Sequence, residues 1–225
     1  MNLPTWITVG RIALTPVLAW LPFLHSATLR GLAFVLYLLV AISDHYDGKL
    51  ARERNEVTNL GRLLDPLADK MLLLAMFIPM YMLQAPRGEW LLRLLPRAAE
   101  ASGYPFVTWT FVPVPLPWWV LFIVLGREAA MTWFRHAAHK RGVVISALGP
   151  GKAKATFQYI WLGAAYFWFA FRTWVEEHGF TSRGWDQLAL FAGTVGMVAM
   201  VIAVILTVWS FIVYVRRYGG VLKGA

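Results

Sequence analysis

Long apolar stretches separated by short charged segments dominate this chain. Most of these stretches approach or exceed the ~20 residues that an α-helix needs to cross a lipid bilayer. The second stretch is shorter and leads into a charged segment, which we expect to continue the same helix through Arg52. The pattern predicts an all-α integral membrane bundle of about six transmembrane helices, over residues 7–24, 32–43, 64–83, 118–136, 151–171 and 188–215.

Residues 85–117 interrupt this pattern. Between residues 88 and 101, Arg93 and Arg97 alternate with apolar residues at helical intervals, which is typical of an amphipathic helix lying on the membrane. Residues 106–117 mix aromatic residues with prolines and are predicted to form an irregular loop at the membrane interface. We therefore expect a single membrane domain over residues 1–225, with an interfacial insertion at 85–117.

The composition narrows the class of protein. Hydrophobic residues occupy 59% of the 225 positions and charged residues 15%, and the mean hydropathy is +0.56. A chain of this composition is too apolar to be an ordinary soluble domain. The chain has no cysteine, which excludes disulfides and thiolate metal sites. Because anionic lipid headgroups account for the net charge of +9 in a membrane protein, we predict no nucleic-acid partner.

The distribution of basic residues predicts the orientation of the chain. Six spans would place fifteen of the 21 Lys and Arg residues on the side that holds the charged segment 44–70, and six on the other side. Cytoplasmic loops of membrane proteins carry the excess of Lys and Arg. The segment 44–70 and both termini are therefore expected to face the cytoplasm.

Four of the five aspartates in the chain lie between residues 44 and 69. Asp44 and Asp47 are three residues apart and Asp65 and Asp69 are four apart, so each pair shares one face of a helix. Carboxylates at the ends of apolar spans are costly to place unless cations compensate them. The spacing thus indicates a divalent-metal site at the membrane surface.

The available ligand atoms narrow the choice of metal. Oxygen-only donors suit Mg²⁺ or Mn²⁺ rather than Zn²⁺. Four carboxylates have enough oxygen atoms for two ions about 3.5–4 Å apart, an arrangement that supports phosphoryl displacement. Gly48 would let a ligand approach the backbone closely, and Arg52 offers a cation for phosphate oxygens.

The same residues carry a resemblance to a known family. The pattern from Asp44 to Asp69 reads D-x2-D-G-x2-A-R-x8-G-x3-D-x3-D and is similar to the full signature of the CDP-alcohol phosphatidyltransferases. Asn2-Leu3-Pro4 and Gly126-Arg127-Glu128 resemble segments of the phosphatidylglycerophosphate synthases in that family. The resemblance covers nearly the whole chain except about 85–117.

The resemblance implies that an alcohol attacks the β-phosphorus of CDP-diacylglycerol and that CMP leaves. It implies metal ligation by Asp44, Asp47, Asp65 and Asp69, with Asp69 as the general base that takes the proton of the attacking hydroxyl. It also implies a homodimer in the bacterial inner (cytoplasmic) membrane. The residues that it indicates for binding CDP-diacylglycerol are Thr5, Thr8, Gly48, Arg52 and Thr58.

A second group of cations bears on the acceptor alcohol. Arg127, Arg135, Lys152 and Lys154 are candidates for binding an acceptor phosphate. Arg127 falls in an apolar span, where a bare charge is costly, so it needs a partner such as Glu128 or a substrate phosphate. The cluster favours glycerol 3-phosphate as the acceptor, with phosphatidylglycerophosphate as the product.

Other functions fit parts of the same pattern. Cardiolipin synthase and the phosphatidylserine and phosphatidylinositol-phosphate synthases use the same donor with another acceptor, and a phosphate-free acceptor would not need Arg127, Lys152 and Lys154 together. A divalent-cation transporter would also use acids within the membrane, but it should place them near the middle of several spans. Simple anchoring at the membrane surface is an equal alternative for Lys152 and Lys154.

Overall fold

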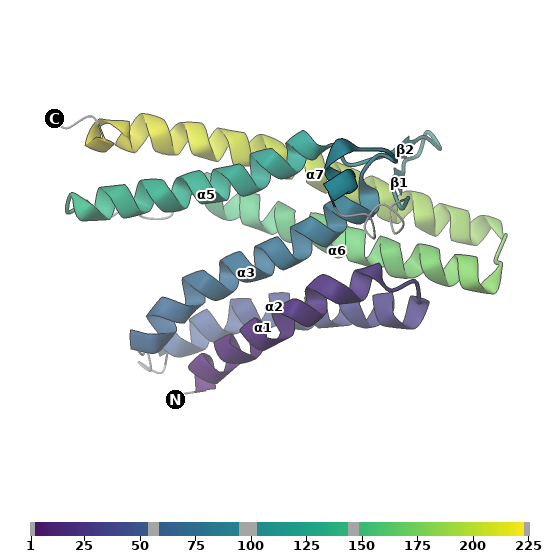
Figure 1. Cartoon of the computed structure of the whole chain (residues 1–225), viewed down its shortest axis with the longest axis horizontal. Helices are drawn as coiled ribbons and strands as arrows, with labels where there is room; N and C mark the ends of the chain where they lie inside the picture. The colour runs from purple at the N-terminus through teal and green to yellow at the C-terminus, as the bar shows by residue number, and fades with distance from the viewer. Residues whose placement is uncertain (1–2, 54–58, 95–102, 144–148, 223–225) are drawn as a thin grey trace.

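The computed structural model consists of long α-helices that run roughly lengthwise through the molecule (Figure 1). It describes residues 3–53, 59–94, 103–143 and 149–222, with side chains described at 6–43, 64, 66–92, 103–143, 151 and 153–220. The α-helices in these residues are α1 (Leu3–Trp20), α2 (Ala27–Glu53), α3 (Asn59–Gln84), α5 (Trp118–Lys140), α6 (Gly149–His178) and α7 (Arg183–Tyr218).

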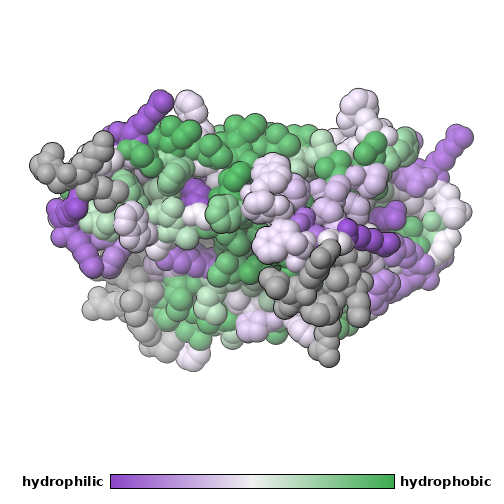
Figure 2. All heavy atoms as spheres, turned by 45° about the horizontal axis from the view of Figure 1, so that its top comes forward, coloured by the Kyte–Doolittle hydropathy of each residue, from purple (hydrophilic) through white to green (hydrophobic). Residues whose placement is uncertain are grey.

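These helices cross the molecule in alternating directions. The start of α1, the end of α2, the start of α3 and the end of α7 lie at one end, which we call the motif end; the turn between α6 and α7 lies at the opposite end (Figure 1). Five of the six predicted spans fall within α2, α3, α5, α6 and α7, whereas the first, 7–24, runs past the end of α1 at Trp20 and through η1 (Leu21–Phe23). Hydrophobic atoms cover much of the middle of the molecule and hydrophilic atoms gather toward its ends (Figure 2).

By length and composition, three of the described helices are apolar enough to cross a membrane: Trp6–Phe23, Pro66–Gln84 and Arg183–Tyr218. A fourth apolar stretch, Ala27–Ser43, is shorter because α2 continues into the aspartate motif. Charged residues in the middle and at the end of α5, including Arg127, Glu128 and Lys140, lower the hydropathy of that helix. The prediction of an all-α membrane protein is confirmed.

Shorter elements complete the described chain. The 3₁₀-helices are η1 (Leu21–Phe23), η2 (Trp90–Leu94) and η3 (Gly219–Leu222), and the strands are β1 (Phe106–Val107) and β2 (Pro113–Val114). The prediction of an irregular loop over 106–117 is wrong in part, because β1 and β2 pair as a short antiparallel hairpin with Phe106 opposite Val114. Pro113 lacks an N–H but is tolerated in a two-stranded sheet, where every strand is an edge. Most of the predicted amphipathic helix over 88–101 lies outside the described residues.

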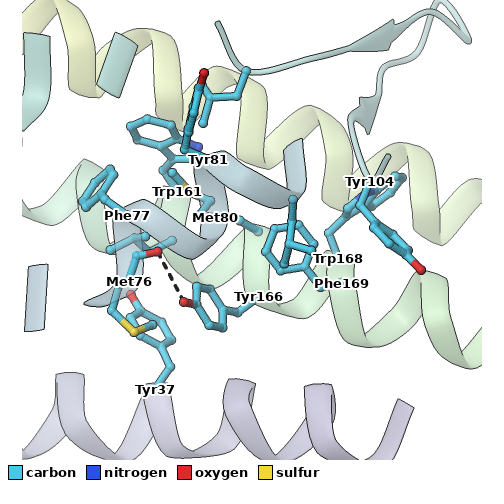
Figure 3. Packing of buried hydrophobic residues seen from close by; sticks show 14 of the residues in the cluster. Tyr37, Met76, Phe77, Met80, Tyr81, Tyr104, Trp161, Tyr166, Trp168 and Phe169 are labelled. Carbon is cyan, nitrogen blue, oxygen red and sulfur yellow. Dashed lines mark hydrogen bonds between the residues drawn. The ribbon is translucent and has the colours of Figure 1, made fainter. Parts of the chain in front are cut away.

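Aromatic side chains of α6 form the centre of the core (Figure 3). Trp161 meets Phe77 of α3 edge to face, with ring centroids 5.1 Å apart. Tyr166 stacks on Tyr37 of α2 and donates a hydrogen bond of 3.3 Å to the carbonyl of Met76. Lipid is as apolar as these side chains, so close packing and satisfied polar groups hold the helices together.

At the opposite end, Arg30 of α2 connects several elements. Its side chain is buried, and its Nε donates to the carbonyl of Pro22 at 2.9 Å. Its Nη1 donates to Oγ1 of Thr173 on α6, and its guanidinium lies 4.3 Å from the centre of the Tyr104 ring. One buried cation thus joins η1, α2, α6 and the segment that follows η2.

Candidate active site

The aspartate motif is divided between two helices. Asp44 and Asp47 lie in the last part of α2, and Asp65 and Asp69 lie in the first turns of α3, so both pairs are at the motif end (Figure 1). Asp69 is the one aspartate of the four whose side chain is described. Of the residues expected to bind the donor, Thr8 is buried on α1. The structure describes only the backbone of Thr5 on α1 and of Gly48 and Arg52 on α2. Thr58 lies outside the described residues.

Asp69 faces an arginine from the first helix. Nη1 of Arg11 lies 3.6 Å from Oδ1 of Asp69, and the arginine side chain is 5% exposed whereas that of Asp69 is 60% exposed. A buried cation within an apolar helix requires an anionic partner, and Asp69 provides one. Sequence reasoning assigned no role to Arg11, although a single charge inside the first apolar stretch was a usable signal.

Asp69 lies on the wall of a cavity of about 570 Å³ between α3 and α5. Its walls combine apolar side chains with a few polar ones, which suits a ligand that is apolar on one side and polar on the other. The lining residues are Asp69, Lys70, Leu73 and Leu74 from α3, and Leu125, Glu128, Ala129, Thr132, Trp133 and His136 from α5.

A second cavity, of about 270 Å³, gathers three of the four cations predicted to bind an acceptor phosphate. Arg127 and Arg135 come from α5 and Lys154 from α6, and Tyr214 of α7 closes the wall. The fourth predicted cation, Lys152, lies in the first turn of α6, with its side chain outside the described part of the chain. Residues 26 positions apart in the sequence, Glu128 and Lys154, thus meet through the packing of separate helices.

Glu128 is the anion at the centre of this cationic cavity. Its Oε1 accepts a hydrogen bond of 3.0 Å from Nη1 of Arg127 and another from Nζ of Lys154. Arg127 is 8% exposed, and its Nη2 also donates to Oγ of Ser210 at 3.1 Å. The prediction that Arg127 needs a partner such as Glu128 is confirmed. One buried atom, Nε of Arg127, has no hydrogen-bond partner among the described residues.

The two cavities meet at one turn of α5. Glu128 and Thr132 line both of them, and Oγ1 of Thr132 donates to the carbonyl of Glu128 at 2.8 Å. A molecule held by Arg127, Arg135 and Lys154 would therefore lie beside the cavity that Asp69 faces. This arrangement suits the joining of two substrates, with an anionic group of one held away from the reacting atoms.

The donor set at the motif end fits a divalent cation. Asp69 offers an exposed carboxylate, and the helix backbones bring the three other aspartates to the same end of the molecule. Carboxylate oxygens without sulfur or imidazole partners are the ligands that Mg²⁺ and Mn²⁺ prefer. Within the described side chains, no three acids or histidines gather as a metal site, and the side chains of Asp44, Asp47 and Asp65 lie outside that description.

Comparisons with known proteins agree with this chemistry. The family model described as CDP-alcohol phosphatidyltransferase matches residues 1–216. A CDP-diacylglycerol–glycerol-3-phosphate 3-phosphatidyltransferase of Rickettsia bellii is 44% identical over 71 residues, which are 32% of this chain and 39% of the relative. Proteins of the same name from Salmonella choleraesuis and Salmonella paratyphi A are 27% and 28% identical, and each alignment covers 97% of this chain and 96% of the relative.

The match with the Rickettsia protein therefore spans about two fifths of that relative's length, whereas the Salmonella matches extend over nearly the whole of both chains. The family model covers both halves of the site, from Arg11 on α1 to Tyr214 on α7. This chain belongs to the CDP-alcohol phosphatidyltransferase family.

Proposed function

We propose that this protein transfers the phosphatidyl group of CDP-diacylglycerol to glycerol 3-phosphate, releasing CMP and forming phosphatidylglycerophosphate. The observation that carries the proposal is the cationic cavity of Arg127, Arg135 and Lys154 beside the cavity of Asp69. The cationic cavity offers binding groups for a phosphate that does not react. The cavity of Asp69 offers a carboxylate beside an apolar wall. The names of the Rickettsia and Salmonella relatives support the same reaction.

In this reaction the acceptor hydroxyl forms a new bond to the β-phosphorus, and the bond between that phosphorus and the oxygen of CMP breaks. Asp69 is the proposed base, and its carboxylate receives the hydroxyl proton. Arg11 holds that carboxylate from the side of α1 at 3.6 Å. The apolar wall formed by residues such as Leu73 and Leu125 keeps the acyl part of the donor beside lipid.

Asp44, Asp47 and Asp65, with Asp69, are the proposed ligands of Mg²⁺ or Mn²⁺, with two ions as the expected number. Such ions, when bound, neutralise the diphosphate of the donor and stabilise the departing CMP. Thr5, Thr8, Gly48, Arg52 and Thr58 are the proposed contacts to the nucleotide part of the donor. Titration of Mn²⁺ into the purified protein should give two sites, and Asp65→Asn should weaken binding; unchanged binding in Asp65→Asn would contradict this ligand set.

The acceptor is tested by supplying CDP-diacylglycerol, Mg²⁺ and one acceptor at a time to the purified protein, and measuring the release of CMP. Glycerol 3-phosphate should support turnover, whereas glycerol, serine, phosphatidylglycerol and inositol phosphate should support little. Turnover with one of these other alcohols, and none with glycerol 3-phosphate, would show that the proposed acceptor is wrong. The family assignment would be unaffected.

Arg135 allows the cationic cavity to be tested without disturbing a buried ion pair, because its side chain is exposed. Arg135→Gln should raise the KM for glycerol 3-phosphate about tenfold, the effect of one lost charge-assisted hydrogen bond of ~1.5 kcal/mol. The matched control is Lys140→Gln, an exposed cation of the same helix that does not line the cavity. Equal KM values in the two variants would refute the phosphate role of Arg135.

We also propose that the protein is a homodimer of the bacterial cytoplasmic membrane, with the motif end in the cytoplasm. The excess of Lys and Arg at the motif end supports this orientation. The dimer is an expectation from the family resemblance, and the mass of the protein in a lipid nanodisc or detergent micelle measures it directly.

A further inference from the structure

The β1–β2 hairpin is docked on α7 through two buried glycines. A Cβ at Gly193 would overlap the carbonyl group of Val107, and a Cβ at Gly196 would overlap the ring of Phe106. Phe106 is 3% exposed and also meets Trp168 of α6, with ring centroids 5.9 Å apart. The base of the hairpin therefore has a fixed height along the bundle.

The distance along α7 from the hairpin base to the motif end matches the thickness of a bilayer. The first charged residue after Asp186 along α7 is Arg216, at the motif end. Gly193 and Arg216 are about 35 Å apart on a helix that rises 1.5 Å per residue, and the hydrocarbon core of a bilayer is about 30 Å thick. With Arg216 at one headgroup layer, the hairpin base lies at the other. Trp118 and Trp119, which follow the hairpin at the start of α5, are also exposed, as Trp is at membrane interfaces.

In the hairpin tip, residues 108–112, Thr108 is buried but the three apolar side chains are unusually exposed. Trp109 is 73% exposed, Phe111 69% and Val112 55%. No Asp, Glu, Lys or Arg occurs between residues 104 and 126. Phe111 has a φ of 57°, the one positive φ of a non-glycine residue in the described part of the chain. This backbone conformation costs energy for a residue with a side chain, so a favourable environment for the outward-facing ring is expected.

We propose that the hairpin tip inserts Trp109 and Phe111 into the lipid headgroup–hydrocarbon boundary at the opposite end, on the far side of the membrane from Asp69. Lipid is the occupant because the tip is uncharged and exposes aromatic side chains, and because its base lies about one bilayer thickness from Arg216 along α7. The glycine notch on α7 sets the depth of insertion. This role is independent of the proposed reaction.

The absence of cysteine makes the test direct, because a single introduced cysteine carries a unique spin label. Thr110→Cys places the label between Trp109 and Phe111 on an exposed side chain. The full chain is reconstituted in vesicles of phosphatidylcholine and phosphatidylglycerol, and collision rates with oxygen and with a water-soluble nickel chelate are measured. Ser182→Cys in the exposed α6–α7 turn is the aqueous reference, and Val201→Cys on the exposed face of α7 is the hydrocarbon reference.

The label at position 110 should collide with nickel several times less often than the label at 182, and more often than the label at 201. Nickel collisions equal to those at 182 would show a tip in water and overturn the proposal. Spin–spin broadening at position 110 that disappears when labelled protein is diluted with unlabelled protein would show that a second copy covers the tip, which overturns the lipid contact as well.

Discussion

Each buried cation of the candidate site forms an ion pair with a carboxylate. Arg11 pairs with Asp69 across two helices, and Arg127 and Lys154 share Glu128. In a membrane bundle an unpaired charge is expensive, so these pairs are conditions for folding as well as parts of the site. Both pairs leave room for substrate, because Asp69 is largely exposed and Glu128 lines two cavities.

Asp69→Asn is expected to reduce the rate of transfer by about 10²–10⁴-fold, because the amide accepts no proton from the attacking hydroxyl. Binding of CDP-diacylglycerol should fall much less, since the three other aspartates are retained. The measurements are CMP release and donor binding to the same preparation. Asp186→Asn is the matched control, because that aspartate lies in the first turn of α7 at the opposite end. Full activity in Asp69→Asn would reject its role as the base.

Glu128→Gln is expected to raise the KM for glycerol 3-phosphate about tenfold, the effect of ~1.4 kcal/mol, with little change in the KM for the donor. Without the carboxylate, Arg127 and Lys154 repel each other and no longer hold one position in the cavity. Glu128→Asp should restore part of the affinity. A lower KM in Glu128→Gln would show instead that the carboxylate competes with the substrate phosphate.

At the residue scale, the sequence singled out the acids and most of the cations of the candidate site but not the contacts between them. Asp69 and Lys154 were recognisable because charges inside or beside apolar stretches stand out. The meeting of Glu128 with Lys154 depends on the packing of α5 against α6, and no spacing within one helix encodes it. Arg11 was overlooked as a site residue because its partner lies on another helix.

At the element scale, apolar periodicity predicted the helices well and the connections poorly. α3, α6 and α7 extend beyond the predicted spans, because polar residues at their ends continue the helical hydrogen bonding. α2 continues through the motif to Glu53, one residue beyond the predicted Arg52. The hairpin was missed because its strands are two residues long and contain Pro113. Gly193 and Gly196 of α7 accommodate the hairpin, a contact that the spacing of two glycines in an apolar stretch does not predict.

Gly196→Ala is expected to destabilise the protein by about 1–3 kcal/mol, because the added methyl group overlaps the ring of Phe106 in a close-packed region. This loss exceeds the gain of up to ~1 kcal/mol that alanine brings to a helix. Gly184→Ala on the same helix meets only Oγ of Ser182, at 3.9 Å, and should be neutral or stabilising. Thermal loss of helical circular dichroism in detergent compares the two, and equal midpoints would contradict the docking of the hairpin on α7.

At the scale of the whole molecule, the two ends differ in chemistry. The motif end carries the aspartates and most of the cations, whereas the opposite end is fixed by aromatic packing around Arg30 and Trp174. Trp174 meets Trp185 at 4.9 Å between ring centroids, in the part of α6 and α7 that continues past the hairpin. α7 has 36 residues, more than the ~20 that a bilayer requires, and with Arg216 at the headgroup layer of the motif end the excess would project at this end.

This asymmetry makes the orientation testable with single cysteines in a cysteine-free chain. Ser182→Cys marks the opposite end, and Lys140→Cys marks the motif end; both side chains are exposed. In spheroplasts, a thiol reagent that does not cross membranes should label position 182 at once and position 140 only after the membrane is permeabilised. The reason is that Lys and Arg are retained on the cytoplasmic side during insertion. Immediate labelling of position 140 would place the aspartates on the external face and contradict the predicted orientation.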